Sequence, residues 1–227
     1  MSARRTAIGQ VAVAIAAAAA LAGCSSGLRS DTTAPVTYVL RAPAVPAAAS
    51  SAGIAQPLPA SVLVARIAAH PGYDGDRIVL LAPDRRLDVY AGSRWPAPAP
   101  ELVGALLVDT LRASGRLRAV HDAAAPFPAD YTLRVTIRRF DADYTAAGLD
   151  AAPRVVVALD GTLGRRADRG VVATFVAETG QDAASNRMGA VVAAFDAALQ
   201  AALRDVASRS IDSVEADLRT SRSPSTP

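Results

Sequence analysis

The clearest alternation of apolar and polar positions lies in the second half of the chain. From Tyr131 to Arg138 every second residue is large and apolar, and the residues between them are Thr or Arg. This two-residue period predicts a strand with one buried and one solvated face. Two further strand-like runs, Arg154–Leu163 and Val171–Glu178, are separated by the polar segment 165–169 and Gly170. The three segments therefore predict an antiparallel meander.

Two stretches have helical spacing instead. The first runs from Pro100, which suits a first helical turn, to Gly115, which can end a helix in the left-handed conformation, and Glu101 adds a favourable charge near its start. The second is longer, roughly Arg187 to Arg219. Its apolar positions recur every three or four residues: Met188, Val191, Val192, Phe195, Leu199, Leu203, Val206, Ile211, Val214 and Leu218.

Shorter strand-like segments fill the first half, and they complete a single domain over residues 35–219. They are Val36–Leu40, Ser61–Ile67, Arg77–Ala82, Arg86–Tyr90 after a turn at Asp84-Arg85, and Leu117–Val120. Residues 41–60 are rich in Ala, Pro and Ser and are predicted to form a loop; residues 220–227 are predicted to be a disordered tail. The sum is an α/β (α+β) sandwich, with one mostly antiparallel sheet and helices on one face.

The N-terminus has the layout of a secretory signal peptide, residues 1–23. Arg4 and Arg5 precede an uncharged stretch that is too short and too rich in alanine for a confident membrane-spanning helix. It ends in Leu21-Ala22-Gly23-Cys24, which resembles a bacterial lipobox, so we expect cleavage between Gly23 and Cys24 and a diacylglyceryl thioether on Cys24. The alternative is an ordinary signal peptide with an incidental cysteine. Lipidation is favoured because Cys24 is the single cysteine and has no disulfide partner in the chain.

The residues after the cysteine bear on location and charge. Residues 24–34 are small and polar, as in a lipoprotein tether, and Ser25 stands where an acidic residue would favour inner-membrane retention, so we expect an outer-membrane anchor facing the periplasm. The whole chain has 24 basic residues, all arginine, against 21 acidic ones. Removal of Arg4 and Arg5 leaves 22 against 21, a net charge of +1, which gives no indication of nucleic-acid binding.

Candidate catalytic residues are few. His70 and His121 each lie beside a turn signal and have no second ligand at metal spacing, and the chain lacks a nucleophile elbow, a phosphate loop and a dinucleotide fingerprint. Asp141 and Asp143 stand two apart at a strand end, hence on one face, although solvated acids at such a place are commoner than an acid–base pair. The sequence therefore favours a binding or structural protein without cofactor or metal over an enzyme.

Several segments, in order, resemble the ABC-type transport auxiliary lipoprotein family, which includes the lipoprotein of the paraquat-inducible transport system. The resemblance spans the chain from Tyr38 to about Val206. Its motifs are Tyr38-Val39-Leu40, Gly72-Tyr73-Asp74, Arg77-Ile78-Val79-Leu80, Leu87-Asp88-Val89-Tyr90-Ala91, Arg94-Trp95, Ala129-Asp130-Tyr131-Thr132-Leu133, Arg138-Arg139-Phe140 and Asn186-Arg187-Met188.

This resemblance implies a fold like that of the TolB N-terminal domain and a non-catalytic role beside an ABC permease and ATPase. The substrate-binding subunit of such systems carries a mammalian-cell-entry (MCE) domain, and the systems move lipids or other hydrophobic molecules across the envelope. The partners implied are the membrane, through the lipid, and the MCE-domain subunit, with no nucleic acid; homo-oligomerisation stays open. The segment 41–60 is longer than the corresponding segment typical of the family.

The Tyr90–Pro96 loop is the leading candidate for partner contact. It holds Tyr90, Arg94 and the single tryptophan, Trp95, and Trp and Arg are favoured at binding hot spots. For Trp95 itself, a place at the end of the core is favoured over a partner contact.

A different class of function is also open: a structural or pilot-type assembly lipoprotein of another envelope complex. A periplasmic hydrolase is disfavoured by the lack of catalytic residues. An adjacent permease, ATPase and MCE-domain gene would favour the transport role, whereas a secretion or pilus cluster would favour assembly.

The anchor gives the first prediction. Cys24→Ser removes the thiol that carries the lipid, so we expect no lipidation and no cleavage by the lipoprotein peptidase. Metabolic labelling with a palmitate analogue checks this, since the wild type should be labelled and the variant should accumulate as unlabelled precursor. Equal labelling of the two proteins would contradict the assignment.

Overall fold

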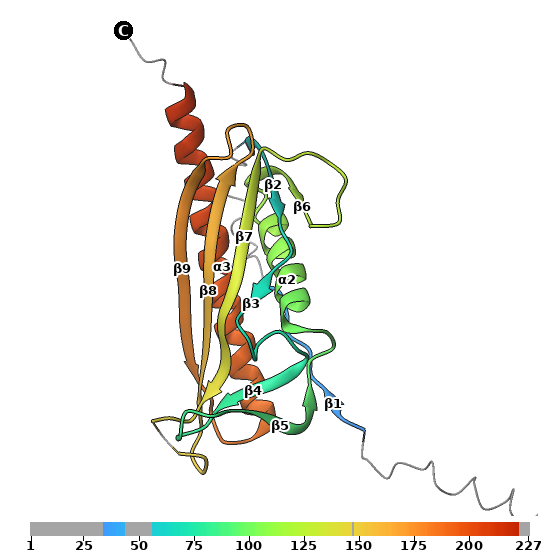
Figure 1. Cartoon of the computed structure of the whole chain (residues 1–227), viewed down its shortest axis with the longest axis vertical. Coiled ribbons are helices and arrows are strands. Elements are labelled where there is room, and N and C mark those ends of the chain that lie inside the picture. The colour runs from blue at the N-terminus through green and yellow to red at the C-terminus, as the bar shows by residue number, and fades with distance from the viewer. Residues whose placement is uncertain (1–33, 44–55, 147, 223–227) are drawn as a thin grey trace, which may run out of the picture. The chain divides into compact units, whose positions relative to one another are not determined.

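A nine-stranded mixed sheet carries two helices on one of its faces (Figure 1). The structure is a computed structural model that describes residues 34–43, 56–146 and 148–222; the predicted signal peptide, Gly23, Cys24 and nearly all of the tether lie outside them. The elements are β1 (Val36–Thr37), β2 (Leu58–Val64), β3 (Ala68–Ala69), β4 (Arg77–Leu81), β5 (Leu87–Arg94), α2 (Ala99–Ala113), β6 (Leu117–His121), β7 (Tyr131–Asp143), β8 (Arg154–Arg165), β9 (Val171–Asp182) and α3 (Met188–Arg222). The predicted α+β class is confirmed.

Strand β7 organises the sheet. One of its edges pairs antiparallel with β8 along its whole length, from Tyr131↔Arg165 to Asp143↔Arg154. The other edge pairs in parallel with three short strands in succession, β2, β3 and β4. Strand β9 continues the meander beyond β8 in antiparallel pairing, as predicted. The long ladders are thus antiparallel, and the short ones are mostly parallel.

A bulge in β7 changes which positions face the helices. Ile137 pairs with Leu159 and Arg139 with Ala158, so Arg138 is the extra residue. Before the bulge the odd-numbered side chains are buried under the helices, and after it the even-numbered Phe140 and Ala142 take their place. Arg138 and Arg139 consequently lie next to each other on the open face.

Helix α3 covers the meander with small and large apolar residues at helical spacing. Ala194, Ala198 and Ala202 alternate with Phe195, Leu199 and Leu203 among its buried positions, and all six are at most 4% exposed. The alanines let the helix lie close to the sheet, whereas the larger residues fill the space between strands. Helix α2 packs against α3, β2 and β6 and ends as predicted, with Gly115 in the left-handed region at φ 61°. No helix in the described ranges combines the length and apolar character needed to cross a membrane.

An aromatic cluster joins Trp95, the residue after β5, to β7 and α3 in the core. The Trp95 ring lies 5.3 Å from Phe195 in an edge-on contact and 5.8 Å from Phe140, and Phe140 and Phe195 are 5.1 Å apart. These centroid separations are those of favourable aromatic pairs.

Several predicted boundaries are corrected. Strand β2 begins at Leu58, inside the predicted 41–60 loop, of which residues 44–55 lie outside the described residues. Strand β5 runs to Arg94, so most of the predicted Tyr90–Pro96 loop is strand. Helix α3 continues to Arg222, three residues into the predicted disordered tail, and the hydroxyls of Thr220 and Ser221 donate to backbone carbonyls one turn earlier.

The N-terminal segment is held to the body at two places. Strand β1 pairs in parallel with the end of β5, Val36 with Ser93 and Thr37 with Arg94. Further along, the backbone and guanidinium of Arg41 donate three hydrogen bonds of 2.8–3.1 Å to Asp196 on α3. The point at which the chain enters the domain is therefore fixed.

The aromatic cluster supplies the second prediction. Phe195→Ala leaves a cavity against Trp95 and Phe140, so we expect a loss of about 3–5 kcal/mol in the free energy of unfolding. Urea unfolding of the chain without residues 1–24 measures it. The matched control is Phe127→Ala, at a side chain that is 63% exposed, where the loss should stay below about 1 kcal/mol. Similar losses at both positions would contradict this account of the core.

Candidate functional site

The acidic pair predicted at the end of β7 is an ion-pair network. As the sequence predicts, Asp141 and Asp143 lie on one face, and the Arg139 guanidinium donates to both, at 2.7 Å and 2.8 Å. The Tyr73 hydroxyl also donates to Asp141, at 2.8 Å. Asp141 is fully buried, so the alternative of two solvated acids is wrong for this residue. The network fastens the loop that holds Tyr73 to the central strand.

The charges of this network stabilise one another. Burial raises the pKa of Tyr73, and the neighbouring Asp141 raises it further. The hydrogen bond to Asp141 is the main reason that the pKa of Arg139 rises above its usual range. Burial alone would raise the pKa of Asp143, but hydrogen bonds from Thr145 and Arg139 outweigh it and lower the pKa. Both carboxylates are held as hydrogen-bond acceptors, which suits a structural clamp.

A second polar chain links three segments near the start of α3. The hydroxyls of Tyr90 on β5 and Tyr144 lie 2.9 Å apart, Tyr144 donates to the Asn186 side chain at 2.7 Å, and Asn186 donates to the Leu149 carbonyl at 2.7 Å. Burial and the hydrogen bond with Tyr144 raise the pKa of Tyr90. The Tyr90 hydroxyl is thus engaged within the fold.

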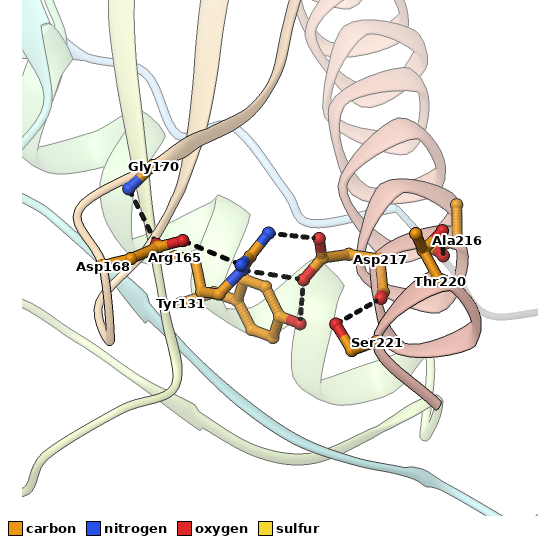
Figure 2. Close-up of polar contacts among 8 residues, drawn as sticks. All are labelled: Tyr131, Arg165, Asp168, Gly170, Ala216, Asp217, Thr220 and Ser221. Atoms are coloured by element: carbon orange, nitrogen blue, oxygen red, sulfur yellow. Dashed lines mark hydrogen bonds and ion pairs between the residues drawn. The ribbon is translucent and has the colours of Figure 1, made fainter. Parts of the chain in front are cut away.

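A third cluster joins the last turns of α3 to the sheet (Figure 2). The Arg165 guanidinium donates to both oxygens of Asp217, at 2.7 Å and 3.1 Å, and the Tyr131 hydroxyl donates to the same carboxylate at 2.7 Å. Arg165 also reaches Asp168, which accepts from the Gly170 backbone N–H. Burial is the main cause that raises the pKa of Tyr131 to about 12. Within this cluster one guanidinium, that of Arg165, is shared by the carboxylates of Asp217 and Asp168.

The predicted partner-contact residues are divided between core and surface. Trp95 is 1% exposed and belongs to the aromatic cluster, in agreement with the alternative that it fills the core. Its indole Nε1 has no hydrogen-bond partner within the described part of the chain. Tyr90 is half-buried, whereas the Arg94 side chain is 48% exposed and lies 3.8 Å from Asp76. Arg94 is therefore the predicted residue that offers a contact surface.

A groove runs along α2, and the sequence did not indicate it. It has a volume of about 610 Å³ and lies between the helix, the segment from β2 to Ile67, and residues 122–124. The residues of α2 that line the groove are Pro100, Glu101, Gly104, Ala105, Val108, Asp109 and Arg112. Asp74 and Pro98 also line it. The volume is within the range of about 300–1,000 Å³ that ligand sites occupy.

The histidines lie apart from these clusters. His121 ends β6 and its ring is 5.8 Å from that of Phe127, and His70 follows β3 and donates its backbone N–H to the Ile137 carbonyl. Within the described ranges, no three His, Cys, Asp or Glu residues are grouped so as to hold a metal ion.

Comparison with protein families gives one match over most of the chain. The model of the ABC-type transport auxiliary lipoprotein component family matches residues 38–207. No curated protein sequence matches.

Solved structures give the same picture. Protein XCC0632 from Xanthomonas campestris, of the DUF330 family, is similar with a TM-score of 0.66 and 26% identity, over 82% of this chain and 98% of that one. The hypothetical protein CT253 from Chlamydia trachomatis has a TM-score of 0.50 and 11% identity, over 70% and 99% of the two chains. The second likeness shows the fold alone.

The lowered pKa of Asp143 gives the third prediction. A carboxyl with a depressed pKa in the folded state stabilises the fold above its unfolded pKa of about 3.9, and that contribution is lost as the pH falls through the folded pKa. Asp143→Asn should therefore cost about 1–3 kcal/mol of unfolding free energy at about pH 7. The difference should shrink below about pH 4.

Urea unfolding across this pH range measures the effect. The same substitution at the exposed Asp150 should change the unfolding free energy by no more than about 0.5 kcal/mol. A cost at Asp143 that does not vary with pH would contradict the assignment.

Proposed function

The chain belongs to the ABC-type transport auxiliary lipoprotein component family, and we propose that it is the lipid-anchored, non-catalytic subunit of an MCE-type transport system that moves lipids or other hydrophobic molecules across the cell envelope. The observation that carries the proposal is the family match over residues 38–207. It covers the elements from just after β1 into α3.

The anchor follows from the N-terminal sequence. We propose that Cys24 carries the lipid and that the anchor lies in the outer membrane, with the body facing the periplasm. Residues 25–34 span at most about 3.5 Å each, or about 35 Å. The fixed entry of the chain at β1, held by β5 and by the Arg41–Asp196 contact, then keeps the whole body near its membrane.

A binding role is supported by how the polar side chains are used. In the clusters around Asp141 and Asp217 each carboxylate lies within ion-pair distance of an arginine, and these contacts tie segments of the fold together. A catalytic acid or base needs access to a substrate, and Asp141 has no exposed surface. Two features of the described surface that can meet an outside molecule are the exposed Arg94 and the groove along α2.

We propose that the partner is the MCE-domain subunit and that Arg94 lies in the contact. Arg94 holds β1 through backbone pairing and the hydrogen bond from Tyr38 to its carbonyl, while its side chain remains on the surface. Arginine is among the residues that contribute most at protein interfaces.

In-cell crosslinking provides the fourth prediction. A photo-crosslinking amino acid in place of Arg94 should form a covalent adduct with an MCE-domain protein, and the wild-type chain should co-purify with that protein. The control position is Arg204 on α3, which is also exposed. If neither position gives an adduct and no transporter subunit co-purifies, the proposed transport role is wrong and an assembly role is favoured.

A further inference from the structure

The groove along α2 has an excess of negative charge. Four acidic side chains and two arginines line it, which gives a formal charge of −2. Arg112 is already used, because it donates to the Val120 carbonyl and lies 3.9 Å from Asp122. The other acids, Asp74, Glu101 and Asp109, make no ion pair with any residue that the structure describes. In the clusters above, by contrast, each carboxylate lies within ion-pair distance of an arginine.

The groove exists because α2 presents small residues between these acids. Gly104 and Ala105 lie on the same helix face as Glu101 and Val108, one turn apart from each, and all four line the groove. A Cβ on Gly104 would lie 3.2 Å from the Ile67 side chain, so this glycine lets the helix approach the segment after β2 closely. The result is a narrow floor of small and apolar side chains with carboxylates along its wall.

We propose that this groove binds an extended segment of the partner transporter subunit that carries arginine or lysine. Glu101 and Asp109 are eight residues apart, about 12 Å along the helix, which corresponds to about four residues of extended chain. A cationic side chain at each end of such a segment would meet one of these carboxylates, and small or apolar residues between them would cover Gly104 and Ala105. The uncompensated carboxylates disfavour the phosphate of an anionic lipid as occupant.

The loop of residues 74–76 connects the groove, which Asp74 lines, to the ion pair of Asp76 with Arg94. The backbone N–H of Trp95 donates to the Asp76 carbonyl at 2.8 Å, and the backbone N–H of Ala99 donates to the Gly75 carbonyl at 2.9 Å. The loop of residues 74–76 thus holds the start of α2 on one side and ends in the ion pair with Arg94 on the other. One partner segment could contact both features, and the inference rests in this respect on the proposed function.

The test uses the full-length lipoprotein in cells that contain the transport system. A photo-crosslinking amino acid replaces Ala105, an exposed groove residue, or Ala113, an exposed residue of the same helix outside the groove. We expect adducts with a transporter subunit from position 105 and none from position 113. Mass spectrometry of the adduct should locate the crosslink within a few residues of an arginine or lysine of the partner.

Charge dependence is tested in the same strain. Adding Glu101→Gln and Asp109→Asn should reduce the adduct from position 105 by about tenfold, as expected for the loss of two modest ion pairs. The matched control is Asp88→Asn with Asp150→Asn, which removes the same charge from exposed sites outside the groove and should leave the yield unchanged. Unfolding curves confirm that each variant is folded.

Other outcomes would overturn the inference. Adducts from position 105 with lipid, with a second copy of the chain, or with a partner segment lacking basic residues would each contradict it. So would a yield that is insensitive to the two groove substitutions. If the transporter subunit still co-purifies and crosslinks at Arg94 while position 105 gives nothing, the groove assignment fails and the proposed function stands. If no transporter subunit co-purifies or forms an adduct at either position, the proposed function itself is wrong.

Discussion

The register of β7 is the constraint on which the rest of the structure depends. This one strand supplies hydrogen bonds to β8 on one edge and to β2, β3 and β4 on the other. Because side chains alternate between faces, a shift of one residue would exchange the buried and exposed sets along the whole strand. The bulge at Arg138 makes this exchange once, at a defined place. Phe140 thereby reaches Phe195 and Trp95, while Arg139 turns to Asp141 and Asp143.

The polar clusters follow from the same register. Tyr131 and Arg165 are paired residues at the beginning of β7 and the end of β8, so they meet Asp217 together. At the opposite end of β7, Arg139 and Asp141 receive Tyr73 from the loop after β3. Each cluster fastens a segment that the sheet alone would leave loose. A body held at both ends of its central strand presents its surface features at fixed positions, which would lower the entropic cost of binding in the partner role proposed above.

Local sequence patterns predicted the helices and strands, but they did not predict which residues far apart in the chain contact each other. The alternation from Tyr131 to Arg138, the stripe of α3 and the glycine after α2 each depend on residues a few positions apart, and all three are confirmed. Asp141 and Asp143 were correctly placed at the end of a strand, but the exchange of buried and exposed faces at Arg138 was not predicted, because the bulge breaks the alternation. The start of β2 was missed because Leu58-Pro59-Ala60 resembles the preceding loop in composition. No sequence signal joins Arg41 to Asp196, or Tyr131 to Asp217, since these partners are separated by 155 and 86 positions.

The sequence also gave no indication of the groove, for a reason that bears on its use. Its acids come from α2, from the loop before β4 and from the segment after β6, and each alone resembles an ordinary solvated carboxylate. Elsewhere in this fold, buried or gathered acids lie within ion-pair distance of an arginine, as at Asp141, Asp196 and Asp217. Among the described groove acids Asp122 has such a contact, with Arg112, whereas Asp74, Glu101 and Asp109 have none and keep their attraction for an outside cation. That attraction favours a basic protein segment over an anionic lipid as the occupant of the groove.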